Sequence, residues 1–109
     1  MLPPVMITSS TETVSGREIT EHLGIACGNT VRAKHVGRDI MAGFKTLVGG
    51  EVSGYTEMLQ ESRNQAVDRM VAQGQAMGAD AIINVRFTTS QVAQGMSEML
   101  AYGTAVKLA

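Results

Sequence analysis

The sequence is short of the residue types that build disulfides, zinc modules and base-stacking surfaces. Its 109 residues include one cysteine, two prolines, no tryptophan, two tyrosines and two phenylalanines. A single cysteine excludes an internal disulfide framework, and it excludes any two-cysteine or four-cysteine zinc module within one chain. With so few aromatic side chains and a net charge of −1 at pH 7, we expect no nucleic-acid partner.

Charged residues are also scarce, at 17% of the chain, whereas apolar residues reach 44%. Soluble domains usually carry about 25% charged residues, so little charge is available to guard exposed apolar surface, and we expect self-association. No apolar run approaches the roughly 20 residues that span a bilayer, and the N-terminus has no basic region typical of a signal peptide. The sequence predicts one domain over residues 1–109, cytoplasmic and without a membrane partner.

The first third of the chain favours strands. A short β-prone run, Val5–Thr8, follows two prolines, and an alternating apolar pattern predicts a strand over Ile19–Cys27. Gly28-Asn29 is typical of a turn, and Thr30–His35 has the composition of a second strand, so we expect a hairpin here. The cations Arg32 and Lys34 share one face of that second strand, where a solvated edge explains them better than a phosphate-binding patch.

The middle of the chain has helical spacing. Val36–Val48 predicts a short amphipathic helix that Gly49-Gly50 ends. A long helix is predicted from Ser53, a capping residue, to Met77, with Gly78 as the stop signal.

The last third returns to strand patterns. Residues Ala81–Ser90 and Glu98–Leu108 predict two strands joined by a polar connection, and Ala81, Ile83, Val85 and Phe87 form the apolar face of the first. Strands on both sides of a helical block indicate an α+β fold with two layers. In this fold a mainly antiparallel sheet packs on one long helix and one short helix.

Several short stretches recur at the spacing of one family. They are Gly24-Ile25 with Gly28, Gly37-Arg38-Asp39, Leu47-Val48-Gly49-Gly50 followed by Tyr55, Met77–Ala81, and Gly103–Lys107. Together they resemble the YbjQ-like family of small prokaryotic proteins, which is often labelled heavy-metal-binding. The resemblance covers nearly the whole chain. It implies an α+β subunit related in shape to dodecin subunits, which assembles into a homopentameric ring, and it implies no defined activity.

Two positions depart from the family pattern. Many members have threonine at the position of Cys27, so a cysteine-based site is not a property of the whole family. Many also carry arginine where this chain has Glu51, which reverses the charge near the start of the long helix.

A soft-metal site needs sulfur and imidazole ligands that converge on one point. The chain offers Cys27, His22 and His35, but at spacings that match no common zinc motif. On a continuous strand His22 and Cys27 have opposite parity and point to opposite faces. Cys27 is most simply a small buried hydrophobic residue, His22 an exposed or hydrogen-bonded one, and His35 a loop residue. A five-fold axis would still repeat one residue into a ring of ligands, which keeps Cys27 and His22 as weak metal candidates.

The sequence nominates no enzyme. It has no Gly-x-Ser-x-Gly elbow and no phosphate-binding loop, and Glu57 and Glu61 fit a solvated helix face near the helix N-terminus. We therefore expect no catalytic residues and no cofactor other than a possible metal ion.

A two-layer α+β unit leaves two sheet edges and one sheet face uncovered. A ring in which each subunit's terminal strands extend its neighbour's sheet would cover them, and such a heterologous contact must close. The interface candidates are Arg38, Asp39, Tyr55 and Arg63. Arg63 lies about 40° from Leu59 around the helix, so it either packs its stem beside the apolar stripe or pairs with a neighbour's carboxylate.

Two functions remain open at this point. The chain is expected to form a non-enzymatic ring that binds a small ligand or metal ion in its pore or between subunits. The alternative is a structural or interaction module without a ligand, which a protein partner recognises.

Overall fold

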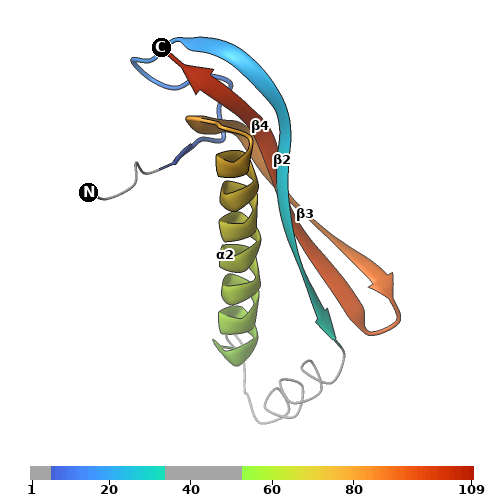
Figure 1. Cartoon of the computed structure of the whole chain (residues 1–109). Helices are drawn as coiled ribbons and strands as arrows, with labels where there is room; N and C mark the ends of the chain where they lie inside the picture. The colour runs from blue at the N-terminus through green and yellow to red at the C-terminus, as the bar shows by residue number, and fades with distance from the viewer. Residues whose placement is uncertain (1–5, 34–52) are drawn as a thin grey trace, which may run out of the picture.

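The computed structural model describes residues 6–33 and 53–109 (Figure 1). The described elements, in chain order, are β1 (Ile7–Thr8), β2 (Ile19–Ala33), α2 (Ser53–Ala76), β3 (Ala81–Ala93) and β4 (Met96–Leu108). The four strands form one sheet in the order β1-β3-β4-β2. β4 pairs antiparallel with both β2 and β3, whereas β1 pairs parallel with β3. The α+β class and the mainly antiparallel sheet are therefore confirmed.

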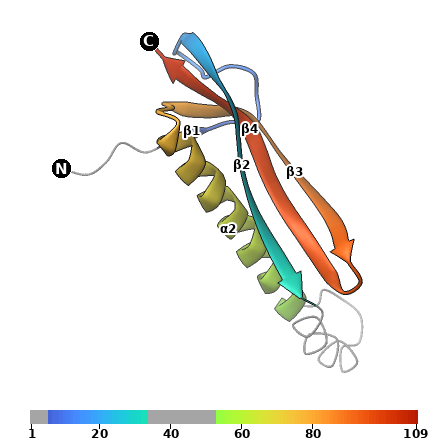
Figure 2. The same ribbon diagram turned by 45° about the vertical axis from the view of Figure 1, so that its right-hand side comes forward.

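Helix α2 covers one face of the sheet, mainly over β2 and β4, and it touches β3 little (Figures 1 and 2). Its bounds agree with the prediction to one residue. The helix ends where expected because Gly78 adopts a φ of 84°, which L-residues rarely do. The predicted short helix over Val36–Val48 lies outside the described residues.

The predicted hairpin at Gly28-Asn29 is wrong, because β2 runs straight through both residues. They pair with Ala101 and Leu100 of β4. Gly28 serves a different purpose: it lies where the backbone of α2 comes closest to the strand. A Cβ atom on Gly28 would overlap backbone atoms of α2, including the amide nitrogen of Met70.

Two hydrophobic clusters lie on opposite faces of the sheet. The first packs under α2 and consists of Ala26, Ala66, Met70, Ile82, Ala101 and Ala105. The second consists of Ala81, Ile83 and Val106, with Ile7, Val14, Ile19 and Leu108 packed against it. Successive residues of a strand point to opposite faces, so Ala81 and Ile82 belong to different clusters.

The predicted apolar face of β3 is only half right. Ala81 and Ile83 belong to the second cluster, whereas Val85 packs against the first. A register shift lies between Ile83 and Arg86, and Asn84 has a φ of 53° there. This irregularity adds one residue to β3 relative to β4, so the side chains that follow it point to the opposite sheet face from the one expected. Val85 and Phe87 therefore lie on the side of α2.

The connection between the last two strands is shorter than predicted. β3 continues to Ala93 and β4 begins at Met96, so most of the expected polar connection is strand. A two-residue turn suffices because Gly95 takes a φ of 74°. The hairpin formed by β3 and β4 diverges from α2 at its tip (Figure 1).

Candidate functional site

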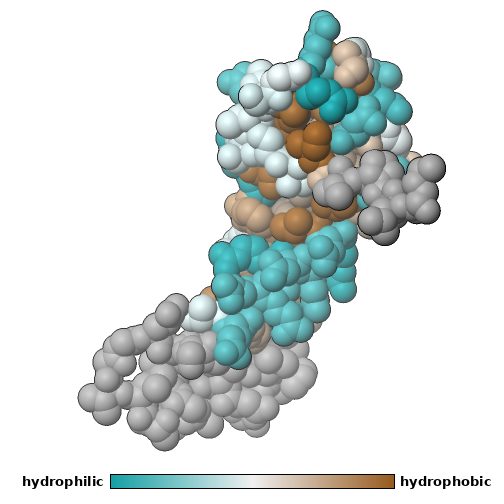
Figure 3. Space-filling model, turned by 90° about the vertical axis from the view of Figure 1, so that its left-hand side faces the viewer, coloured by the Kyte–Doolittle hydropathy of each residue, from teal (hydrophilic) through white to brown (hydrophobic). Residues whose placement is uncertain are grey.

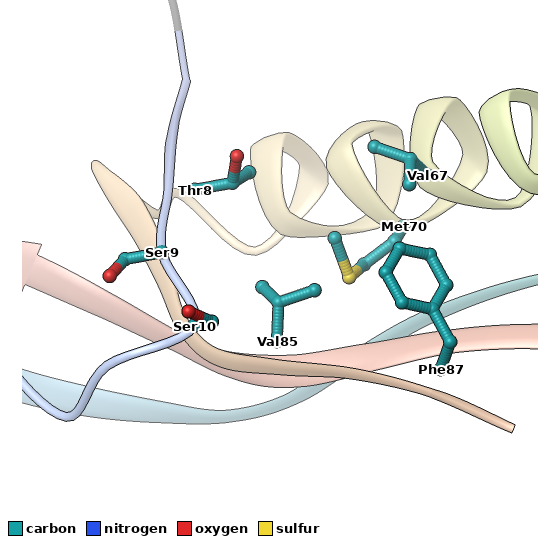
Figure 4. A pocket seen from close by; sticks show the side chains of 7 residues that line it. All are labelled: Thr8, Ser9, Ser10, Val67, Met70, Val85 and Phe87. Atoms are coloured by element: carbon teal, nitrogen blue, oxygen red, sulfur yellow. The ribbon is translucent and has the colours of Figure 1, made fainter.

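A small open pocket lies where the N-terminal segment, α2 and β3 meet (Figure 4). It has a volume of about 230 Å³. Of the described residues that line it, three carry hydroxyl groups and four are apolar: Thr8, Ser9, Ser10, Val67, Met70, Val85 and Phe87. On this side of the molecule, hydrophobic surface gathers above a band of hydrophilic side chains (Figure 3).

Backbone hydrogen bonds fix the N-terminal wall of the pocket. The Ser9 amide donates to the carbonyl of Ile82 at 2.9 Å, and the Val85 amide donates to the carbonyl of Ser9 at 2.9 Å. Arg86 also donates from its guanidinium to the carbonyl of Ser10 at 2.8 Å. These bonds extend the short strand β1 along the start of β3, so this wall is preformed.

The opposite wall comes from α2 and β3. Val67 and Met70 project from the helix, and Phe87 lies beside Met70 in Figure 4. Met70 is fully buried, whereas Phe87 is 47% exposed. Among the described residues that line the pocket, none has an ionisable side chain, so these residues offer no acid–base pair. Its chemistry suits a small apolar group that hydroxyl groups contact at one side.

Cys27 and His22, the two predicted metal ligands, both lie on β2 and are exposed. The interpretation of Cys27 as a buried residue is wrong. α2 covers the opposite face of β2, where the neighbouring Ala26 is buried, and alternation therefore turns the Cys27 side chain to the open face.

The prediction that Cys27 and His22 point to opposite faces is also wrong. They pair with Tyr102 and Val106 of β4, which share one face, because a register shift after His22 adds one residue to β2. The two β4 partners are four residues apart, which is about 14 Å along a strand. A metal ion bonds sulfur and imidazole nitrogen at about 2.0–2.3 Å, so the two residues of one chain do not share an ion.

The remaining predicted site residues are placed as follows. His35, Arg38 and Asp39 lie outside the described residues, and Tyr55 belongs to α2 with its side chain outside the description. Arg63 is exposed on α2. Within residues 6–33 and 53–109, no group of three or more His, Cys, Asp or Glu side chains is arranged to hold a metal ion.

Two side chains of α2 bind the outer edge of β2, and sequence reasoning missed both. The Gln73 side-chain oxygen accepts the backbone amide of Cys27 at 2.5 Å. Arg69 donates to the backbone carbonyl of Asn29 at 2.6 Å. They lie four residues apart on one flank of the helix, a spacing that the sequence shows but does not link to β2.

Arg32 does not form the solvated edge that the sequence predicts. It is half-buried under α2, donating from Nε to the Ser62 hydroxyl at 2.7 Å and from its terminal nitrogen to the Gln65 side-chain oxygen at 3.1 Å. Thr30 is buried beside it and donates to the Ser62 carbonyl at 3.3 Å. Arg32 thus joins β2 to α2, while Lys34 lies outside the described residues.

Comparison with known proteins identifies the family. A family model described as "Putative heavy-metal-binding" matches residues 6–109. The chain belongs to this family. This confirms the resemblance to YbjQ-like proteins that the sequence motifs carry.

Similar proteins, named UPF0145 proteins, occur in both bacteria and archaea. A UPF0145 protein of Photobacterium profundum is 63% identical over 103 residues, covering 94% of this chain and 100% of the relative. A UPF0145 protein of Archaeoglobus fulgidus is 58% identical over 103 residues, covering 94% of this chain and 95% of the relative.

The fold also occurs in a solved structure. A DUF74-family protein of unknown function from Pediococcus pentosaceus superposes with a TM-score of 0.62 at 13% identity, covering 95% of this chain and 98% of that one. At this identity the likeness concerns the fold alone. Among the described residues, no helix is long and apolar enough to cross a membrane.

Proposed function

We propose that this chain is one subunit of a non-enzymatic homo-oligomeric ring that binds a small ligand or metal ion in its pore or between subunits. In the proposal the subunit is dodecin-like, the ring has five copies and it is cytoplasmic, as the sequence and the resemblance imply. The observation that carries the proposal is a set of large hydrophobic side chains exposed on the sheet: Ile25, Val31, Phe87, Val92 and Tyr102.

The size of these exposed side chains makes assembly favourable. Ile25 is 72% exposed and Val92 is 52% exposed. Fully burying one side chain of this kind is worth about 1.5–3 kcal/mol, so covering the exposed parts of all five contributes several kcal/mol per subunit. A neighbour with the same chain is always available to provide that cover.

A ring also supplies what one copy lacks for metal binding. Cys27 and His22 are exposed, and a five-fold axis would present either residue five times. Thiolate and imidazole are ligands for zinc and softer metals, which agrees with the family description. In this proposal the ligands to one ion come from several copies.

The test is elemental analysis and native mass spectrometry of protein purified from its native host. The proposal predicts an oligomer with stoichiometric metal or a bound small molecule, and metal binding should be lost in Cys27→Ser or in His22→Ala. A metal occupancy unchanged in both variants would refute these ligands. An empty ring that co-purifies with another protein would instead support the alternative of an interaction module.

A further inference from the structure

The sheet has two long edges that face away from its centre. Among the described strands β2 is the last on one side, so its 15 residues, Ile19–Ala33, form one edge. On the other side β1 pairs with β3 only at Ala81 and Ile82. Residues 87–93 of β3 have no strand partner on that side among the described residues.

Over residues 25–33 of β2 and 87–93 of β3, both edges lack two of the usual protections against strand pairing, a charged side chain left free on the strand and a proline. Natural edge strands are guarded by such residues, by short length, by β-bulges or by a covering helix. Here a register shift lies between Gln91 and Ala93 of β3, and α2 covers the β2 edge with the side chains of Arg69 and Gln73. Residues 87–93 contain no charge and no proline. Between residues 25 and 33 of β2 the one charged side chain is Arg32, and its hydrogen bonds to Ser62 and Gln65 turn it under α2.

The contacts of α2 show which backbone groups of β2 point outward from the sheet, where Gln73 and Arg69 bind them in the single copy. The Cys27 amide and the Asn29 carbonyl point away from β4, since Gln73 and Arg69 bind them from outside the sheet. Both of these helical residues are exposed. A strand paired at this edge would replace Gln73 and Arg69 as the partners of these two groups.

We propose that residues 87–93 of β3 in one copy pair with the β2 edge of the next copy, around Cys27 and Asn29. This inference rests on the proposed ring, because the two edges are different surfaces and their pairing is a heterologous contact that a ring closes. β2 and β3 both run antiparallel to β4 and so share one direction. In a ring closed by strand pairing the symmetry axis runs along the strands, and rotation about that axis leaves the direction of each strand unchanged. β3 of one copy and β2 of the next therefore pair in parallel.

This pairing also covers an exposed aromatic ring. Phe87 pairs with Ala101, which is buried under α2, so Phe87 faces the helical side of the sheet while remaining 47% exposed. When β3 pairs with the next copy's β2, the Phe87 phenyl group lies next to that copy's α2, on the flank that carries Arg69 and Gln73. The Arg69 guanidinium, released from Asn29, can then stack on the phenyl group, a contact worth about 0.5–1 kcal/mol or more.

Native Cys27 provides the probe for the test. Thr88 and Ser90 lie on the open face of β3, because they pair with Leu100 and Glu98, which share the face of Tyr102. Thr88→Cys and Ser90→Cys are each oxidised mildly or treated with a short bis-maleimide, and the products are separated by denaturing gel electrophoresis. Within one chain β4 separates β3 from β2 by about 9.6 Å, beyond the roughly 7 Å that a disulfide tolerates. A disulfide product therefore joins different copies.

The pairing predicts a ladder of cross-linked products from at least one of the two variants, and the ladder should vanish when Cys27→Ser is added. Thr89→Cys is the matched control, because its side chain faces α2 and should not reach Cys27.

Three outcomes would overturn the inference. Cross-links that persist with Cys27→Ser would show that two β3 edges pair with each other. A ring mass by native mass spectrometry without any cross-link would reject the edge pairing while the proposed ring stands. A monomer would reject both.

Discussion

Replacing Gly28 with alanine tests the close approach of α2 to the edge strand, on which the packing of the whole unit depends. The new Cβ would overlap the Met70 amide nitrogen and the Ala66 carbonyl oxygen, and it would lie 2.7 Å from the carbonyl carbon of Arg69. All three are backbone atoms, so no side chain can rotate away. Since ordinary contacts of a Cβ atom begin at 3.4 Å, the helix must move outward.

The cost follows from what that movement opens. Ala26, Ala66 and Met70 are fully buried between α2 and the sheet. Inserting a methyl group into a packed core usually costs about 1–3 kcal/mol, and a clash with a helix backbone belongs at the upper end of that range or above. For a domain of this size, about 3 kcal/mol lowers Tm by roughly 10–20 °C.

The assay is urea and thermal unfolding followed by circular dichroism, at one fixed protein concentration because assembly makes Tm concentration-dependent. Gly16→Ala is the matched control: nothing lies within 4 Å of its added Cβ, and only its φ of 76° adds strain. It should cost about 1–2 kcal/mol. A Gly28→Ala variant within 0.5 kcal/mol of the natural protein would refute the reasoning.

Two further predictions follow from the helix and the hairpin. Arg32→Met removes the hydrogen bonds to Ser62 and Gln65 at a half-buried position, so it should lower the free energy of unfolding by about 1–2 kcal/mol. The control is Arg63→Met on the exposed face of α2, which should change the free energy of unfolding little. Equal losses in urea unfolding would contradict the role of Arg32. Phe87→Ser removes a ring that is 47% exposed and should weaken self-association at least tenfold in sedimentation velocity; unchanged association would show that Phe87 lies outside the contact.

The sequence predicts the elements whose signals are local. The bounds of α2 follow from Ser53, from a regular apolar spacing and from Gly78, and the structure ends the helix one residue before the predicted end. The α+β class follows from strands on both sides of that helix, and the antiparallel β3–β4 hairpin is present with a tighter turn at Gly95.

The errors arise where tertiary contacts decide. Gly28-Asn29 is a dipeptide typical of turns, but the structure requires glycine at position 28 for another reason. The backbone of α2 passes so close to β2 there that a Cβ atom would not fit. The register shifts after His22 and after Ile83 reverse the alternation, and no local pattern marks them. The exposure of Cys27 depends on which face of β2 the helix covers, and the bonds of Arg69 and Gln73 to β2 depend on the same docking.

The central claim is that one copy of this chain is an incomplete unit that its own copies complete. Native mass spectrometry at micromolar concentration tests it most directly. The proposal predicts a closed species near five times the subunit mass of 11.5 kDa. A single species at 11.5 kDa across the micromolar range would contradict it.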